Sequence, residues 1–307
     1  MEGTVVASHG RHCMVETADG ERRICHPRGK KSQAVVGDRV LWQAPPPGQG
    51  DEGTIEKVLE RRNLFYRQDE IRTKSFAANI DQVLILIAAE PVFSESQLAR
   101  ALIAAEAAHI QPLIALNKRD LTEPFARAWE RLAPYRRMGG AHAYEVLALG
   151  LAQADAADRA TLQRCLQGKA TLVLGPSGSG KSTLINLLVP GAQVQTGEIS
   201  QALNSGKHTT TATRWYWVDR TSGTALIDSP GFQEFGLHHI APTQLAACMP
   251  DIAAHASDCR FYNCTHLHEP GCGVISAVEN TDNADGISAN RYKIYSDLFA
   301  ELSQTRY

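Results

Sequence analysis

The eight residues at positions 175–182, Gly-Pro-Ser-Gly-Ser-Gly-Lys-Ser, constrain the fold of this chain more than any other stretch. They match the G-x-x-x-x-G-K-[ST] phosphate loop, in which glycines let successive backbone N–H groups turn toward an anion at a helix N-terminus. The stretch follows an apolar run at 170–174 and precedes residues 183–188, which have the apolar spacing of a helix. This context predicts a nucleoside triphosphate site; the alternative is an ordinary Gly- and Ser-rich loop.

Two side chains of the phosphate loop have distinct expected roles. Lys181 would reach the β- and γ-phosphates, and the Ser182 hydroxyl would ligate the Mg²⁺ that accompanies the nucleotide. The nucleotide contacts expected from this stretch are Gly175, Pro176, Ser177, Gly178, Ser179, Gly180, Lys181, Ser182 and Thr183.

A second short motif indicates which base is bound. Asn117-Lys118-Arg119-Asp120 follows the apolar run 112–116. An Asp carboxylate accepts two hydrogen bonds from N1–H and the exocyclic amino group of guanine, whereas adenine has no such pair of donors. The motif therefore predicts guanine recognition, with all four residues as nucleotide contacts; the alternative is an accidental match.

Two further stretches are typical of a γ-phosphate sensor. In Asp228-Ser-Pro-Gly231, the carboxylate fits a group near Mg²⁺ and the Gly231 N–H fits a γ-phosphate contact, with a plain Pro-Gly turn as the alternative. Residues 206–211, Gly-Lys-His-Thr-Thr-Thr, lie between this motif and the phosphate loop. There the Thr210 hydroxyl would complete the Mg²⁺ shell in a segment that orders around the γ-phosphate.

The order of these motifs is unusual. In ordinary small GTPases the guanine motif follows the phosphate loop, whereas here it precedes it. The sequence therefore predicts a circularly permuted α/β P-loop GTPase domain over residues 66–235, with its ligand at the carboxyl ends of the strands. The expected strands are 83–89, 112–116, 144–147, 170–174, 213–219 and 224–228, and the expected helices are 94–108, 124–138 and 158–167.

Residues 1–65 have a different pattern, of short strands without helices. The candidate strands are 3–7, 12–17, 22–26, 39–43 and 54–58. Five such strands favour an OB-fold β-barrel. Basic residues at Arg22, Arg23, Arg28, Lys30, Lys31, Arg61, Arg62, Arg67, Arg72 and Lys74 make RNA-backbone binding one interpretation, and solvated surface charge is the other. We expect residues 63–78 to be a linker.

Residues 236–307 carry a Cys/His cluster, Cys259-x₄-Cys264-x-His266-x₅-Cys272. Three thiolates and one imidazole close a tetrahedral shell, which predicts one structural Zn²⁺ in an α-helical domain. The alternatives are His268 or, less well placed, Cys248 as a ligand, or buried free cysteines beside a loop histidine. Helices are expected at 242–248 and 288–303.

The composition of the chain excludes few classes of function. The chain has 307 residues, 43% of them hydrophobic, and a formal net charge of −2, which gives no overall attraction to nucleic acid. It has no apolar run of about eighteen residues and no signal-peptide pattern, so we expect a cytoplasmic protein without membrane contact. Three of the seven cysteines cluster near the C-terminus, which favours a metal site over disulfides.

The permuted motifs, the barrel and the Cys/His cluster together resemble the ribosome small subunit-dependent GTPase A family of bacteria. The resemblance covers nearly the whole chain. Further matches are Ala77-Ala-Asn79-Ile-Asp81, Gly206-Lys-His-Thr-Thr-Thr211, Asp228-Ser-Pro-Gly-Phe232 and Glu269-Pro-Gly-Cys272.

The resemblance implies a role in late maturation of the 30S ribosomal subunit. It implies weak intrinsic GTP hydrolysis that 30S stimulates, and contacts of the barrel and zinc domains with 16S rRNA. The expected partners are GTP and GDP, the 30S subunit and 16S rRNA, and we expect a monomer. The chain departs from the family at Leu147-Ala148, where the fifth guanine-contacting motif usually has Ser-Ala.

The group that orients the attacking water is not at its usual position. Ras-type GTPases place a glutamine just after Asp-x-x-Gly, where this chain has Phe232, which does not polarise water. His208 is the nearest catalytic candidate, as the resemblance also implies, and the alternative is a solvent-exposed loop histidine. Two functions fit: a GTPase that uses hydrolysis to time its release from 30S, or a nucleotide-gated RNA-binding module whose hydrolysis is incidental.

Overall fold

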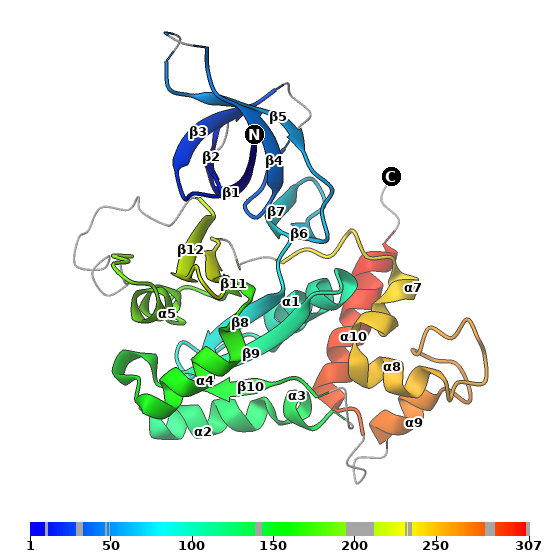
Figure 1. Ribbon diagram of the computed structural model, residues 1–307. Coiled ribbons are helices and arrows are strands. Elements are labelled where there is room, and N and C mark those ends of the chain that lie inside the picture. The colour runs from blue at the N-terminus through cyan, green and yellow to red at the C-terminus, as the bar shows by residue number, and fades with distance from the viewer. Residues whose placement is uncertain are drawn as a thin grey trace.

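The chain forms a barrel, an α/β sheet and a group of C-terminal helices (Figure 1). The computed structural model describes residues 1–9, 12–28, 33–46, 48, 50–138, 143–194, 212–230, 232, 235–279 and 286–304. Among the described helices, none has both the length and the apolar character needed to cross a bilayer.

The predicted five-stranded barrel is confirmed. Its strands are β1 (Glu2–His9), β2 (His12–Glu16), β3 (Arg22–Pro27), β4 (Arg39–Gln43) and β5 (Gly53–Val58). β1, β2 and β3 are antiparallel neighbours, β3 pairs with β5, and β4 pairs with both β5 and β1. Alternate side chains of these strands fill a small core of their own, which includes Val5, Val15, Val40, Trp42 and Ile55.

The expectation of a linker at 63–78 is wrong. These residues form a hairpin of β6 (Leu64–Gln68) and β7 (Thr73–Ala78). Phe65 and Phe76 pack against each other and against Phe235, which lies far away in the sequence. The local sequence pattern therefore did not reveal the residue against which the apolar face of this hairpin packs.

The α/β part is built on parallel strands, as predicted from the continuous apolar runs. Its sheet has the order β10-β9-β8-β11-β13-β12, in which only β12 is antiparallel to its neighbour. The strands are β8 (Gln82–Ala88), β9 (Gln111–Asn117), β10 (Val146–Ala148), β11 (Ala170–Leu174), β12 (Arg214–Asp219) and β13 (Thr224–Asp228).

Helices cover both faces of this sheet, and the alternation along β8 shows how. Val83, Ile85 and Ile87 face the core that contains α1 (Glu95–Ala107). Leu84 and Leu86 face the core of α4 (Ala156–Leu166) and α5 (Lys181–Leu188). Ser94 caps α1 by accepting from Gln97 N. The other helices of this part are α2 (Thr122–Arg131), α3 (Ala133–Arg137), the short η2 (Leu151–Gln153), α4 (Ala156–Leu166) and α5 (Lys181–Leu188).

The single helix expected at 124–138 is two helices. α2 ends at Arg131 and α3 begins at Ala133, with Pro134 in its first turn. Proline has no N–H to continue the hydrogen-bond ladder of α2 but is accepted where a helix starts. The chain therefore restarts its helix at this point.

The C-terminal helices pack beside α1 (Figure 1). They are α7 (Pro242–Leu245), η3 (Ala246–Cys248), α8 (Pro250–Ala256), α9 (Gly273–Glu279) and α10 (Ala289–Ser303). The first two and the last match the expected helices, whereas α8 and α9 were not predicted. Buried Arg291 of α10 binds Asp251 of α8 through two hydrogen bonds of 2.8 and 2.7 Å, which ties the first helices to the last.

A buried carboxylate joins the barrel to β12. Glu16, 5% exposed, accepts from Trp217 Nε1 at 2.7 Å and from Arg220 at 2.8 and 3.0 Å. Arg22 Nε, from the barrel, donates to the same carboxylate at 2.7 Å. Burial alone raises the pKa of Glu16, but these hydrogen bonds outweigh it, so the pKa lies below its ordinary value. Glu16 thus fixes the barrel against the β12–β13 hairpin.

Replacing Glu16 with glutamine should destabilise the chain by about 1–3 kcal/mol, because charge-assisted hydrogen bonds are lost. The side chains of Arg22 and Arg220 are 46% and 51% exposed, so water recovers part of the loss. Because the folded pKa is lowered, the stabilisation is fully present above the unfolded pKa of about 4.3 and is lost as the pH falls through the folded value. Thermal unfolding between about pH 7 and pH 3 measures both effects.

The control for this experiment is Glu21→Gln, since Glu21 makes a surface ion pair and its side chain is 61% exposed. Its melting temperature should stay near that of the unmodified chain. Equal melting temperatures for Glu16→Gln and Glu21→Gln would contradict the role assigned to Glu16.

Candidate nucleotide and metal sites

The phosphate-loop residues connect β11 to α5, at the carboxyl edge of the sheet. Two of its glycines are required by their surroundings. A Cβ on Gly175 would lie 2.0 Å from the Leu86 carbonyl oxygen. Gly180 has a φ of +106°, and a Cβ there would lie 2.3 Å from Asn117 Nδ2. The loop therefore packs against β8 and β9 with no room for side chains at these positions.

Lys181, at the start of α5, and Asp228, at the end of β13, interact electrostatically. Lys181 Nζ donates to the carbonyl oxygens of Gly175 and Pro176 at 2.7 and 2.9 Å. Burial lowers the pKa of Lys181, and Asp228 opposes that shift. Burial likewise raises the pKa of Asp228, which is 5% exposed, and Lys181 and Arg214 oppose it. Both charges are poorly solvated, which suits groups that complete their coordination with an anion and a metal ion.

Asn117 has a role that the sequence did not indicate. Its side chain, 4% exposed, donates from Nδ2 to the Ser179 carbonyl oxygen at 2.9 Å and accepts at Oδ1 from Leu151 N at 3.0 Å. It therefore links the end of β9 to both the phosphate loop and the loop after β10. A polar residue at the end of an apolar strand is the sequence signal that could have indicated this role, but the partners of Asn117 are 62 and 34 residues away.

The other residues of the guanine motif lie on the surface of the same edge. Lys118 is half-buried with a φ of +68°, and Asp120 is exposed. The Arg119 guanidinium binds Asp158 at 3.1 Å through both terminal nitrogens and Asp155 at 3.1 Å. Arg119 thus anchors the start of α4, and its N–H donates to the Leu149 carbonyl at 3.0 Å.

Some of the other predicted site residues lie outside the described residues, and others lie in the core. Gly231, His208 and Thr210 lie outside the described residues. Phe232, at the position of the Ras-type glutamine, is 6% exposed and belongs to the core. Leu147 lies within β10, and its side chain packs in the core beside α4 and α5.

The four predicted metal ligands converge. The ligand atoms of Cys259, Cys264, His266 and Cys272 all lie within 4.8 Å of one another. Cys259 Sγ lies 3.8 Å from Cys272 Sγ and 3.4 Å from His266 Nδ1, and the Cys272 Sγ to His266 Nδ1 distance is 3.6 Å. Zinc bonds of about 2.3 Å to sulfur and about 2.0 Å to nitrogen give tetrahedral edges of about 3.8 and 3.5 Å. The cluster therefore fits Zn²⁺.

The loop that carries His266 is held by side chains around it. Glu269 accepts from Thr265 N at 2.8 Å and from Leu267 N at 3.2 Å. Tyr292 of α10 donates to the His266 carbonyl oxygen at 2.8 Å. His268 is exposed and Cys248 lies in η3, so neither belongs to the four-residue cluster.

Comparison with known proteins agrees with this architecture. A sequence model of the family described as RsgA GTPase matches residues 58–238. The small ribosomal subunit biogenesis GTPase RsgA of Variovorax paradoxus is 72% identical over 306 residues, covering 100% of this chain and 94% of the relative. The protein of that name from Burkholderia pseudomallei (strain K96243) is 51% identical over 305 residues, covering 99% and 93%.

Two solved structures share the fold. The crystal structure of YjeQ from Thermotoga maritima superposes with a TM-score of 0.73 at 30% identity, covering 99% of both chains. That of YloQ, described as a circularly permuted GTPase, gives a TM-score of 0.69 at 28% identity, covering 100% of this chain and 96% of the other. With a matching family model over more than half of its length and full-length relatives, this chain belongs to the RsgA GTPase family.

Proposed function

We propose that this GTPase binds the 30S ribosomal subunit and its 16S rRNA, assists late maturation of the subunit, and uses GTP hydrolysis to time its release. The observation that carries the proposal is the Asn117 bridge, which joins the phosphate loop to the two loops expected to hold guanine. The names of the relatives, small ribosomal subunit biogenesis GTPase, supply the partner. Such a role would place the chain in the cytoplasm, and we take it to act as a monomer.

In this proposal the edge formed by β9, β11 and β13 binds GTP. Lys181 exchanges its loop carbonyls for the β- and γ-phosphate oxygens, and the backbone N–H groups of the phosphate loop hold the same phosphates. Ser182, Thr210 and Asp228 would hold the nucleotide's Mg²⁺, directly or through water, and the ion would supply charge neutralisation at the phosphates. Gly231 N–H contacts the γ-phosphate, and His208 orients the attacking water.

Asp120→Asn should exchange the base preference from guanine to xanthine. The amide would offer a donor where xanthine has a carbonyl in place of the guanine amino group, and guanine would lose an acceptor. We expect GTP affinity to fall at least about tenfold and XTP affinity to rise. Competition binding with GTP, XTP and ATP measures this. The exposed neighbour Glu123, mutated to Gln, is the control, and an unchanged GTP preference in Asp120→Asn would refute the assignment.

We propose that Cys259, Cys264, His266 and Cys272 bind one structural Zn²⁺. Four protein ligands close the shell, so the ion has no open position for water chemistry. Its ligands come from the segment between α8 and α9, whose ends it would hold together.

Several of the basic residues for which we considered RNA-backbone binding form ion pairs within the protein. Acidic partners lie beside Arg22, Arg23, Arg28, Arg61 and Arg62, at distances of 2.6–3.0 Å. Exposed pairs of this kind exchange with phosphate at little cost, because surface ion pairs contribute only about 0–1 kcal/mol. Arg22 and Arg61 differ, since their partners Glu16 and Asp38 are buried, so we assign both arginines to the structure of the barrel and its junction with β12.

Sedimentation with purified subunits tests the proposed release. The chain loaded with a non-hydrolysable GTP analogue should sediment with 30S, and the GDP-loaded chain should not. Subunits of the 50S type are the control for non-specific RNA binding. If the chain sedimented equally with 30S in both nucleotide states, it would bind its partner, but GTP hydrolysis would not time its release.

A further inference from the structure

Arg119, the third residue of the guanine motif, is bound by two acidic side chains from another segment of the chain. Each of its terminal nitrogens donates to one carboxylate oxygen of Asp158 at 3.1 Å, and Nη2 also donates to Asp155 at 3.1 Å. The Asp158 side chain is buried, where a carboxylate without a partner is costly. Paired hydrogen bonds between a guanidinium and a carboxylate are a strong form of this contact. We call Arg119, Asp155 and Asp158 the Arg119 cluster.

The Arg119 cluster holds both ends of the loop between β10 and α4. Asp155 is the N-cap residue of α4 and Asp158 lies in its first turn, so the two carboxylates mark the end of this loop. At the beginning of the loop, Arg119 Nη1 donates to the Ala148 carbonyl oxygen at 3.3 Å. The Arg119 N–H donates to the Leu149 carbonyl oxygen at 3.0 Å. A single arginine therefore fixes where the loop begins and where it ends.

Asn117 binds the middle of the same loop. Its Oδ1 accepts from Leu151 N at 3.0 Å. Asn117 and Arg119 thus both bind the loop after β10, and Lys118 and Asp120 are the members of the motif left to contact a base. The loop and the motif lie side by side because β9 and β10 are parallel neighbours that end at the same edge of the sheet.

This loop follows the position at which the chain departs from its family. Leu147-Ala148 stands where Ser-Ala is usual, and the Leu147 side chain lies in the core, so it offers no hydrogen-bonding group at the sheet edge. Guanine has a carbonyl at C6 where adenine has an amino group, so a site that selects guanine there needs a donor. The backbone N–H groups of the loop are donors close to Asp120.

We infer that Arg119 is a positioning residue for guanine, which sets the distance between the loop after β10 and Asp120 without touching the nucleotide through its guanidinium. A loop N–H would donate to the C6 carbonyl while Asp120 accepts from the neighbouring edge of the base. Hydrogen bonds weaken steeply with misalignment, so a loop that is free to shift would lose this contact first. The inference rests on the proposed nucleotide site and names a residue that determines its specificity.

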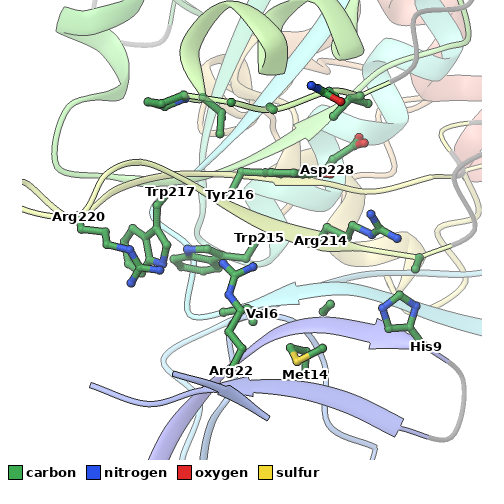
Figure 2. A pocket seen from close by; sticks show the side chains of 18 residues that line it. Val6, His9, Met14, Arg22, Arg214, Trp215, Tyr216, Trp217, Arg220 and Asp228 are labelled. Atoms are coloured by element: carbon green, nitrogen blue, oxygen red, sulfur yellow. The ribbon is translucent and has the colours of Figure 1, made fainter. Parts of the chain in front are cut away.

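The phosphate end of the site is separate from the Arg119 cluster. Strands β8 and β11 lie between β9 and β13, the strand that ends in Asp228. Figure 2 shows Asp228 and Arg214 at a cavity of about 990 Å³ between the barrel and the sheet, and the described residues that line this cavity include no member of the Arg119 cluster. Loss of Arg119 should therefore raise KM for GTP and leave kcat unchanged, the pattern expected when only uniform binding is removed.

The test compares the affinities of the full chain for GTP, ITP and the triphosphate of 2-aminopurine riboside. ITP keeps the C6 carbonyl, and the 2-aminopurine nucleotide lacks it. We expect Arg119→Ala to bind GTP and ITP about tenfold more weakly, the effect of about one hydrogen bond, and to bind the 2-aminopurine nucleotide as before. Unchanged binding of that nucleotide also shows that the variant is folded.

Two further variants show whether Arg119 acts through its acidic partner. Asp158→Asn keeps an acceptor for the helix cap but removes the ion pair, so it should weaken GTP and ITP binding as Arg119→Ala does. The double variant should lose no more than either single variant, because both side chains act through one contact. The matched control is Arg159→Ala, an exposed arginine of α4 beside Asp158, which should bind all three nucleotides normally.

Two results would overturn the inference. A purely structural role would lower the melting temperature of Arg119→Ala without changing the ratio of its affinities for GTP and the 2-aminopurine nucleotide. Weakened GTP binding in Arg119→Ala with normal binding in Asp158→Asn would make Arg119 a direct nucleotide contact. Asp120→Asn, measured alongside, separates the inference from the proposed site. If only Asp120→Asn loses its guanine preference, the role of Arg119 is wrong; if neither variant does, the proposed nucleotide site fails.

Discussion

Replacing Cys264 with alanine is expected to release bound zinc and to loosen the segment between α8 and α9, while GTP binding survives. The four ligands lie within fourteen positions of sequence, and the free energy of about 10–16 kcal/mol with which structural sites bind Zn²⁺ is also local folding energy. The phosphate loop and the guanine motif belong to other elements, at the sheet edge. Loss of the metal should therefore stay local.

Zinc content per chain and limited proteolysis measure this effect. We expect about one zinc per chain before mutation, and far less in Cys264→Ala together with new cleavage between residues 257 and 272. His268→Ala is the matched control and should keep its zinc, because His268 is exposed and outside the cluster. Full zinc in Cys264→Ala, or loss of zinc in His268→Ala, would contradict the ligand set.

The second large effect is expected at His208. If His208 orients the attacking water, His208→Ala should lower 30S-stimulated turnover about 10²–10⁴-fold, the usual contribution of a positioned general base. GTP affinity and 30S binding should stay near normal, because the phosphate and guanine contacts are intact. Lys181→Ala should differ by weakening both binding and turnover, since a phosphate clamp acts on the ground state and the transition state alike.

Single-turnover hydrolysis at saturating 30S, with nucleotide and 30S binding measured in parallel, separates these two variants. The proposed requirement for 30S would have a physical reason. The sequence of residues 206–211 is rich in Gly and Thr and has no apolar side chain, and fixing such a sequence in one conformation costs entropy that partner contacts could repay. Near-normal turnover in His208→Ala would assign the water to another group, such as a backbone carbonyl, a Thr hydroxyl or an rRNA phosphate.

Much of the fold was predictable because its signals are local. The apolar runs at 170–174 and 224–228 match β11 and β13 without shift, and their fixed neighbours in the motifs place them in one sheet. The same holds for the four metal-site residues, whose spacing already limits them to one loop region. Sites whose residues are close together in the sequence can therefore be predicted without knowledge of the fold.

What the sequence did not reveal depends on distant partners. The hairpin at 64–78 packs against Phe235, and the Asn117 side chain forms hydrogen bonds with Ser179 and Leu151. Because these partners are distant in the sequence, the residues near the hairpin and near Asn117 did not indicate either role. Arg119 was assigned to the nucleotide with its motif, and its guanidinium binds Asp158 of α4 and Asp155, the N-cap residue of that helix. The partners of Glu16 are equally distant, because Trp217 lies in β12 and Arg220 directly follows it.

We propose that the small ribosomal subunit controls GTP hydrolysis by this chain. The most direct test is steady-state GTP turnover by the full chain alone, with purified 30S and with purified 50S. We predict slow turnover alone, a large stimulation by 30S only, and loss of all stimulated turnover in Lys181→Ala. Turnover that 30S leaves unchanged would contradict the claim and would favour a nucleotide-gated RNA-binding module whose hydrolysis is incidental.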